Sequence, residues 1–296
     1  MISYMENDIN KKKKVQSFIK KKWPEIYNKE LELELYFICK SYIRKFEKNA
    51  LRFNAVEIET INRCNNDCSF CPVSRNFEKR EFRLMDKNLF LKIISELHEI
   101  GYSGQINLFS NNEPLLDKRI FEFAEIVRNQ VPKAKINFYT NGILLDEYKF
   151  WQLIDNIDYM QIDNYSDSYE IQKNLQFLLP LFNSNTRINK KVNIVVMKKN
   201  QIRSTRGGES PNNLKSKTVK CSCVLPYQQM VIRPDGGVSL CCNDAYGQMT
   251  LGNVNDNSLI EIWNSDQYKK MREMIKQGRK NIKLCRYCDS YDKGRY

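Results

Sequence analysis

The chain has 296 residues, of which 42% are hydrophobic, so it is long enough to bury the core of one large domain and a small second one. The net charge is +13, no run of about eighteen apolar residues occurs and the amino-terminal segment is Lys-rich, so we expect neither a transmembrane helix nor a secretory signal. Ten cysteines without such a signal favour metal ligation in a reducing cytoplasm over disulfides.

Residues 1–52 form a predicted basic extension that is partly helical. Lysine runs make its first part polar, and we expect residues 1–22 to be poorly ordered. Apolar side chains at helical spacing then predict a helix from Pro24 to about Lys48, with Cys39 as a small buried hydrophobe. We expect this helix to cover the bottom of the domain that follows.

From residue 53 to residue 205, strand-like and helix-like patterns alternate. The predicted strands are 54–60, 105–109, 135–140, 158–163 and 192–197, and the predicted helices are 86–100, 117–130, 146–156 and 168–180. Such alternation is typical of right-handed βαβ units and predicts an α/β fold with a parallel sheet.

Three closely spaced cysteines, Cys64, Cys68 and Cys71, follow the first predicted strand in the string INRCNNDCSFCP. Three thiolates on one short loop can bind three irons of a cubane cluster and leave a fourth iron open for chemistry. Zinc is the alternative, but zinc sites usually show paired CxxC units or histidines. The single histidine, His98, falls within a predicted helix, and we expect it to have a surface or packing role.

The loop CNNDCSFC, including the aromatic Phe70, resembles the CxxxCxxC loop of radical S-adenosylmethionine (SAM) enzymes. The resemblance implies a partial parallel (β/α) barrel over residues 53–205, a 4Fe–4S cluster on the three cysteines, and SAM bound at the open iron. The segment Asn111–Pro114 resembles the family's GGEP motif, although both glycines are asparagines here. It implies that Asn112 and Glu113 bind the cofactor, with Glu113 as the partner of its amino group.

Polar residues also end two later strands. Thr140 and Asn141 end the third predicted strand, and Asp163 and Asn164 end the fourth. In the family such positions contact the cofactor, and we expect the same here. The alternative is that each residue caps a helix or forms a turn.

A second group of cysteines lies in the last part of the chain, in the order Cys221, Cys223, Cys241, Cys242, Cys285 and Cys288. The sequence predicts a hairpin, with strands at 229–233 and 238–241, and a helix at about 258–277. Four of these thiolates can bind either an iron–sulfur cluster or zinc, and spacing alone does not decide between them.

The order CVLP, DGGVSLCC, LGNV, EIWN and CRYC resembles the SPASM family of auxiliary-cluster domains, in its shorter version called twitch. The resemblance implies that residues 206–296 form a small α+β hairpin–helix domain. It also implies a second 4Fe–4S cluster, with the ligands Cys223, Cys241, Cys285 and Cys288. Cys221 and Cys242 remain as spare thiols.

The segment RSTRGG places Arg206 at the start of this domain and resembles radical SAM dehydrogenases of the aminoglycoside pathway. The resemblance implies oxidation of a secondary alcohol on a sugar, cyclitol or aminoglycoside-like substrate, with Arg206 as the catalytic residue in the substrate site. The alternative for Arg206 is one more arginine in a basic loop. We expect a small-molecule substrate, sugar-like or anionic, and an electron donor such as flavodoxin or ferredoxin.

Two other functions remain open from the sequence. Radical modification of a ribosomal peptide, by epimerisation or thioether formation, uses the same two modules, and Cys221 or Cys242 would then be a hydrogen donor. Residues 187–220 contain ten Lys or Arg and one acid, so a non-catalytic iron–sulfur or zinc protein that binds nucleic acid is the second alternative. A solvated basic face explains this stretch equally simply, and no familiar nucleic-acid motif occurs.

Overall fold

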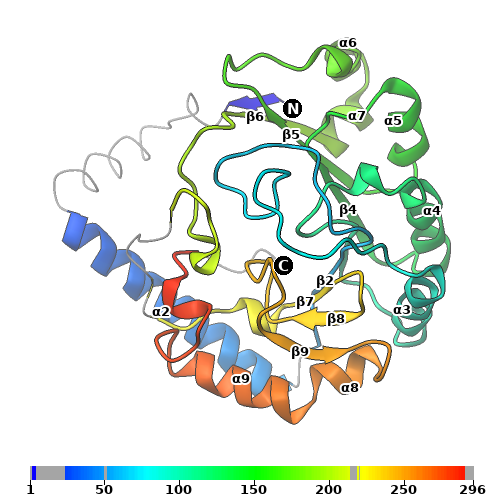
Figure 1. The fold of residues 1–296 in the computed structure, drawn as a ribbon. Helices are drawn as coiled ribbons and strands as arrows, with labels where there is room; N and C mark the ends of the chain where they lie inside the picture. Colours follow the sequence, from blue (N-terminus) through cyan, green and yellow to red (C-terminus); the bar gives the residue numbers. More distant parts are fainter. Residues whose placement is uncertain (1, 5–23, 50–51, 214–218, 220, 291–296) are drawn as a thin grey trace.

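One curved and mostly parallel sheet runs through the molecule (Figure 1). The structure is a computed structural model that describes residues 2–4, 24–49, 52–213, 219 and 221–290. Within these residues the strand order is β1-β6-β5-β4-β3-β2-β7-β8-β9. The strands are β1 (Ile2–Tyr4), β2 (Ala55–Ile58), β3 (Gln105–Asn107), β4 (Lys135–Thr140), β5 (Tyr159–Tyr165), β6 (Val192–Met197), β7 (Gln229–Ile232), β8 (Gly237–Ser239) and β9 (Thr250–Asn253).

Helices cover the outer side of this sheet (Figure 1). The longer ones are α2 (Pro24–Asn49), α3 (Lys87–Glu99), α4 (Ile120–Gln130), α5 (Glu147–Ile154), α6 (Leu178–Ser184), α7 (Thr186–Lys191), α8 (Leu259–Trp263) and α9 (Asp266–Lys276). Helices α3 to α7 follow the convex face of β2 to β6, whereas α2, α8 and α9 lie near β7 to β9. This arrangement confirms the predicted α/β partial barrel with its hairpin–helix addition.

The two faces of the barrel strands differ in chemistry. In β5, Met160 and Ile162 are fully buried beneath the helices, while Gln161 and Asp163 point to the other face and are partly accessible. Alternation of this kind directs apolar side chains into the core between the sheet and its helices, and polar side chains to the inner, concave face of the sheet. The inner face is therefore where a polar ligand can be held.

The predicted helix at 168–180 is wrong. The chain turns there and then forms a short 3-10 helix at Lys173–Leu175, followed by α6 and α7. The side chain of Asn164 explains the difference, because it donates to the carbonyl of Glu170 and accepts from the amide of Gln172. These bonds hold residues 170–172 against the end of β5, so the next α-helix begins only at Leu178.

The cluster-domain hairpin extends the barrel sheet. Strand β7 pairs in parallel with β2, with Val56 opposite Met230, and β8 returns antiparallel to β7. The expected boundary at residue 205 stays a prediction, since the sheet is continuous across the two parts. The expected single helix at 258–277 is two helices, because Ser265 accepts a hydrogen bond from the amide of Tyr268 and begins α9.

The amino-terminal region also differs from expectation in two respects. Residues Ile2–Tyr4 form a strand parallel to β6, and residues 5–23 lie outside the described residues. Helix α2 is present as predicted, but it packs on the cluster domain: the Phe46 ring lies 5.2 Å from the Tyr227 ring, and the Cys39 thiol donates to the carbonyl of Ser222. Among the described helices, none combines the length and apolar character that a membrane span requires.

Candidate active site and metal centres

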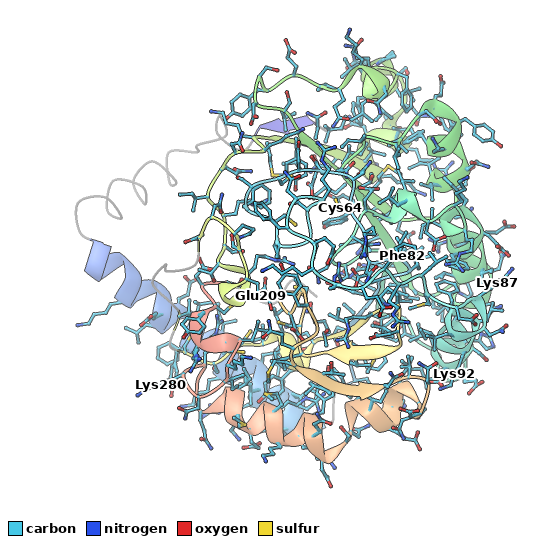
Figure 2. The ribbon with its side chains drawn as sticks, viewed as in Figure 1. Cys64, Phe82, Lys87, Lys92, Glu209 and Lys280 are labelled. Atoms are coloured by element: carbon cyan, nitrogen blue, oxygen red, sulfur yellow. The ribbon has the colours of Figure 1, made fainter. Side chains whose placement is uncertain are left out.

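The loop after β2 brings the first three cysteines to the inner side of the sheet. Figure 2 shows Cys64 on this loop, inside the curve of the strands. Cys68 is buried, while Cys64 and Cys71 are half-buried. The loop is tight, because the amide of Cys71 donates to the carbonyl of Cys68 at 3.2 Å. Burial raises the pKa of the Cys68 thiol, and the thiols of Cys64 and Cys71 lie close enough to Cys68 to raise it further.

Metal ligation by these thiols requires that they lose their protons. Burial raises the pKa of Cys64 to about 12 and also raises the pKa of Cys68. Buried thiols of this kind keep their protons until a cation replaces them, so metal binding releases protons. In the part of the chain that the structure describes, no three His, Cys, Asp or Glu side chains are arranged around a single ion. A cubane cluster does not need that arrangement, because each cysteine binds a separate iron.

Glu113 is an enclosed acid near this loop, with 1% of its surface exposed. Its carboxylate accepts hydrogen bonds from Thr140 Oγ1 at 2.7 Å, from the amide of Asn141 at 2.7 Å and from the amide of Leu115 at 3.1 Å. Burial raises the pKa of Glu113 to about 7. An ammonium group beside it would restore the ionised form, which is what a ligand amine can supply.

Thr140 and Asn141 hold the residues around Glu113 in place. Thr140 Oγ1 donates to Glu113 and accepts from the amide of Gly142, so its hydroxyl is already used. The side-chain Nδ2 of Asn141 donates to Cys64 Sγ at 3.7 Å and to Asn65 Oδ1 at 2.7 Å. Both residues lie beside the predicted site and act on it through Glu113 and Cys64.

Asn112 leaves a donor available. Its Oδ1 accepts from the amide of Ser110, whereas its buried Nδ2 has no partner among the described residues. A buried donor without a partner is costly, and a ligand carboxylate or hydroxyl would satisfy it. This orphaned donor, the adjacent Glu113 carboxylate and the cysteine loop together fit a cofactor with amino and carboxylate groups.

The predicted residues at the end of β5 divide between two locations. Asp163 lies on the inner face, and burial raises its pKa while Arg203 lowers it. The same Arg203 lies over the Phe70 ring at 5.3 Å, so Phe70 and Asp163 face one region. Asn164 is completely buried on the opposite face, with its amide bonded to residues 170 and 172. The expectation that Asn164 contacts the cofactor is therefore wrong.

The second group of cysteines surrounds a cavity. Cys223, Cys241, Cys285 and Cys288 all line it, and its described lining residues include neither Cys221 nor Cys242. Cys241, Cys285 and Cys288 are buried, with 7–8% of their surface exposed. Four thiols around one enclosed space are the donor set of a closed 4Fe–4S cluster.

Arg206 connects the two cysteine groups. Its Nη2 donates to Asn111 Oδ1 and, at 3.0 Å, to the carbonyl of Cys242. Asn111 immediately precedes Asn112 and Glu113, while Cys242 immediately follows the cavity-lining Cys241. The Nε of Arg206 is buried and has no partner among the described residues. One guanidinium therefore lies between both sites with a donor still available.

The RGG sequence explains this placement of Arg206. Arg206 and the two following glycines all have positive φ angles, of 51°, 67° and 89°. The left-handed conformation costs a non-glycine residue about 1–2 kcal/mol. A Cβ on Gly207 would lie 2.6 Å from Leu284 Cδ1, and the φ of 67° at this position favours glycine in any case. The two hydrogen bonds of Nη2 hold the Arg206 side chain on this strained backbone.

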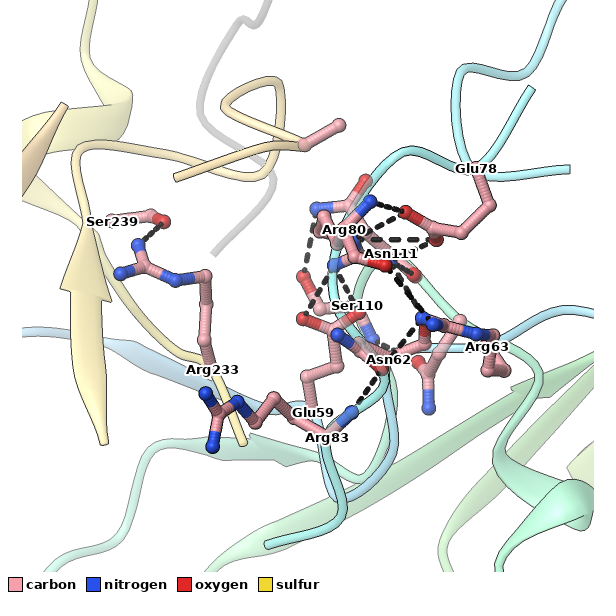
Figure 3. A network of polar contacts seen from close by, with 12 residues as sticks. Glu59, Asn62, Arg63, Glu78, Arg80, Arg83, Ser110, Asn111, Arg233 and Ser239 are labelled. Atoms are coloured by element: carbon pink, nitrogen blue, oxygen red, sulfur yellow. Dashed lines mark hydrogen bonds and ion pairs between the residues drawn. The ribbon is translucent and has the colours of Figure 1, made fainter. Parts of the chain in front are cut away.

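A buried network of polar contacts includes the backbone of Asn111 (Figure 3). Arg80 donates to Glu59 at 2.9 and 3.1 Å, to Glu78 at 2.8 Å and to the carbonyl of Asn111 at 2.9 Å. The side chains of Arg80 and Glu59 are 10% and 1% exposed, and burial raises the pKa of Glu59 to about 7. Neither Arg80 nor the amide of Asn111 was singled out from the sequence. The substitution of asparagine for the motif glycine was the one available signal.

Comparison with protein families assigns both halves of this site. Residues 58–176 match the radical SAM superfamily, and residues 221–289 match SPASM, an iron–sulfur cluster-binding domain. The first three cysteines lie within the former match, and the four cavity-lining cysteines lie within the latter. The predicted cofactors, iron–sulfur clusters and SAM, are thereby confirmed for the two domains.

Individual relatives resemble the chain over most of its length. The S-adenosyl-L-methionine-dependent 2-deoxy-scyllo-inosamine dehydrogenase of Niallia circulans is 26% identical over 239 residues, which is 80% of this chain and 93% of the relative. The crystal structure of BtrN in complex with AdoMet and 2-DOIA has a TM-score of 0.71 and 26% identity, and it covers 83% of this chain and 98% of that chain. The structure of anSMEcpe with bound AdoMet is 14% identical with a TM-score of 0.54, covers 80% of this chain and 86% of that one, and shares the fold alone.

Proposed function

This chain contains a radical SAM domain and a SPASM domain, and we propose that it oxidises a secondary alcohol of a cyclitol, sugar or aminoglycoside-like substrate to a ketone. The relative from Niallia circulans supports this proposal, since its name describes a dehydrogenase that acts on 2-deoxy-scyllo-inosamine. The placement of Arg206 between the two cysteine groups is the observation that carries the proposal.

When bound, the iron–sulfur cluster and SAM would supply radical chemistry that removes a hydrogen atom from a substrate carbon. Cys64, Cys68 and Cys71 would hold this cluster. Glu113 would pair with the amino group of the cofactor, and Asn112 Nδ2 would donate to its carboxylate. Thr140 and Asn141 keep Glu113 in position, as their hydrogen bonds to it indicate.

Arg206 would act on the substrate oxygen. Its guanidinium donates hydrogen bonds and stays protonated, so it can orient a hydroxyl and stabilise negative charge on that oxygen as the hydroxyl proton leaves. Asn111 and the carbonyl of Cys242 hold Nη2, and Nε, which has no partner among the described residues, is a donor available to the substrate. A polar, hydroxyl-bearing substrate fits this arrangement better than an apolar one.

The second electron of an alcohol oxidation also needs an acceptor. Cys223, Cys241, Cys285 and Cys288 enclose one cavity, and a cluster bound by four thiolates has no open iron for a substrate. Such a centre suits electron transfer. We further propose that flavodoxin or ferredoxin supplies the first electron and that the enzyme acts in the cytoplasm.

The proposal is tested by product analysis with reconstituted enzyme, SAM, a reductant and 2-deoxy-scyllo-inosamine or a related cyclitol. We expect a ketone two hydrogens lighter than the substrate, formed in equal amount with 5′-deoxyadenosine. Cys64→Ala should form neither product. A product of unchanged mass, or one that carries a solvent hydrogen at the reacting carbon, would indicate epimerisation and refute dehydrogenation.

A further inference from the structure

Arg279 is a buried cation beside the second group of cysteines. Only 2% of its surface is exposed, and it lines the same cavity as the four cysteines. Its Nη1 donates to the carbonyl of Ser290 at 2.8 Å, and its Nη2 donates to the carbonyl of Ser222 at 3.4 Å. Its Nε is buried without a partner among the described residues. Two of the five guanidinium N–H groups are thus used, and the N–H on Nε is among those left for whatever fills the cavity.

Thiolates that bind a cluster in this cavity would compensate the charge of Arg279. Burial lowers the pKa of Arg279, but the nearby cysteines Cys223, Cys288, Cys221 and Cys285 raise it above its usual value. A buried cation is costly unless it is paired. The cysteines offer negative charge only when they are deprotonated, which is their state when they bind a metal. The guanidinium and the ligated cluster would thus stabilise each other.

We propose that Arg279 raises the reduction potential of the auxiliary cluster by placing a fixed positive charge and an N–H donor beside it. The reduced cluster carries one more negative charge than the oxidised cluster, so a nearby cation stabilises the reduced form. Hydrogen bonds to cluster sulfurs act in the same direction. Arg279 is in this sense a positioning and tuning residue that does not touch the substrate.

The consequence for the reaction rests on the proposed function. After hydrogen abstraction, the substrate radical loses one electron and its hydroxyl proton to become the ketone. The oxidised auxiliary cluster gains that one electron. A higher potential makes this transfer more favourable, so Arg279 would support the second half of the oxidation.

A purely structural role is the competing explanation, because Arg279 also ties residues 222 and 290 together. The chain offers a matched control in Arg272, which is 5% exposed and lies seven positions earlier. Arg272 stacks on the rings of Trp263 and Tyr268 at 4.0 and 4.4 Å and donates to the carbonyls of Trp263 and Pro226. Its surroundings are aromatic rings and backbone, so its removal costs stability without changing the charge at the cysteines.

The experiment is a redox titration of the auxiliary cluster, followed by electron paramagnetic resonance. The full chain carries Cys64→Ala, Cys68→Ala and Cys71→Ala, so that only the auxiliary cluster is bound. In this background, Arg279→Gln should lower the equilibrium constant for one-electron reduction at least about tenfold, equal to about 59 mV. Arg279→Lys keeps the charge and should change it less than about threefold.

Arg272→Gln should lower the melting temperature and leave the potential unchanged. An unchanged potential in Arg279→Gln at full iron content would overturn the proposal. An equal shift in Arg272→Gln, or loss of the cluster from both Arg279 variants, would likewise assign Arg279 a structural role only. The titration uses no SAM and no substrate, so its outcome is separate from that of the proposed alcohol oxidation.

Discussion

Replacement of Arg206 by lysine keeps the positive charge and removes the planar fork. In the structure one guanidinium nitrogen, Nη2, reaches both Asn111 Oδ1 and the carbonyl of Cys242, and Nε remains as a further donor. A lysine ammonium at this position cannot hold both partners and still present a donor in the direction of Nε. A hydrogen bond to a charged group contributes about 1.5–3 kcal/mol, so the loss of one such contact in the transition state predicts about a 10-fold to 150-fold lower rate of ketone formation.

The assay measures ketone and 5′-deoxyadenosine in the same reaction. Arg206→Lys should lower the ratio of ketone to 5′-deoxyadenosine, while the iron content and the substrate-independent cleavage of SAM stay within about twofold of the unmodified enzyme. Arg187→Lys is the control, because Arg187 belongs to the same basic stretch but forms an exposed ion pair with Asp155. If Arg206→Lys makes ketone at the normal rate, or if it loses a cluster, Arg206 does not act on the substrate oxygen.

Three further predictions concern the residues around the two cysteine groups. Cys241→Ala should lose the auxiliary cluster and about half of the iron, whereas Cys242→Ala should keep both, because of these two cysteines only Cys241 lines the cavity. Iron analysis that gives the reverse pattern would contradict the assignment of Cys241 as the ligand. Glu113 has its pKa raised to about 7 by burial, so its carboxylate is protonated at lower pH and SAM should bind about tenfold more weakly at pH 6 than at pH 8. Calorimetry on Glu113→Gln should show weak binding with no such pH dependence, and a persistent dependence would assign it to another group. Asn111→Gly restores the motif glycine but removes the side-chain amide that holds Arg206. Ketone formation should therefore fall about tenfold while the affinity for SAM stays unchanged. An unchanged rate of ketone formation would show that the amide is dispensable.

Local patterns made much of the fold predictable. Alternation in β4 and β5 and helical spacing in α3 to α5 depend on residues only a few positions apart, and each of these elements is present. The cysteine loop was equally readable, since its three thiols lie within eight residues of sequence. Such features follow from the geometry of a single element.

Contacts between distant segments could not be predicted in this way. Arg206 meets Asn111 across 95 positions, and Asn111 meets the carbonyl of Cys242 across 131 positions. Asn164 was misread because a polar residue at a strand end looks the same whether it faces the site or caps the next turn. Strand β7 was predicted as one arm of a hairpin, but period-two alternation says nothing about its second neighbour, β2.

The most direct test of the proposed function follows the hydrogen that the substrate loses. A cyclitol substrate carrying deuterium at the reacting carbinol carbon is incubated with the reconstituted enzyme, SAM and a reductant. The proposed reaction predicts one deuterium in each 5′-deoxyadenosine and none in the ketone, with the two products in equal amounts. Recovery of 5′-deoxyadenosine without deuterium, or of an alcohol that has exchanged its label for a solvent hydrogen, would contradict it.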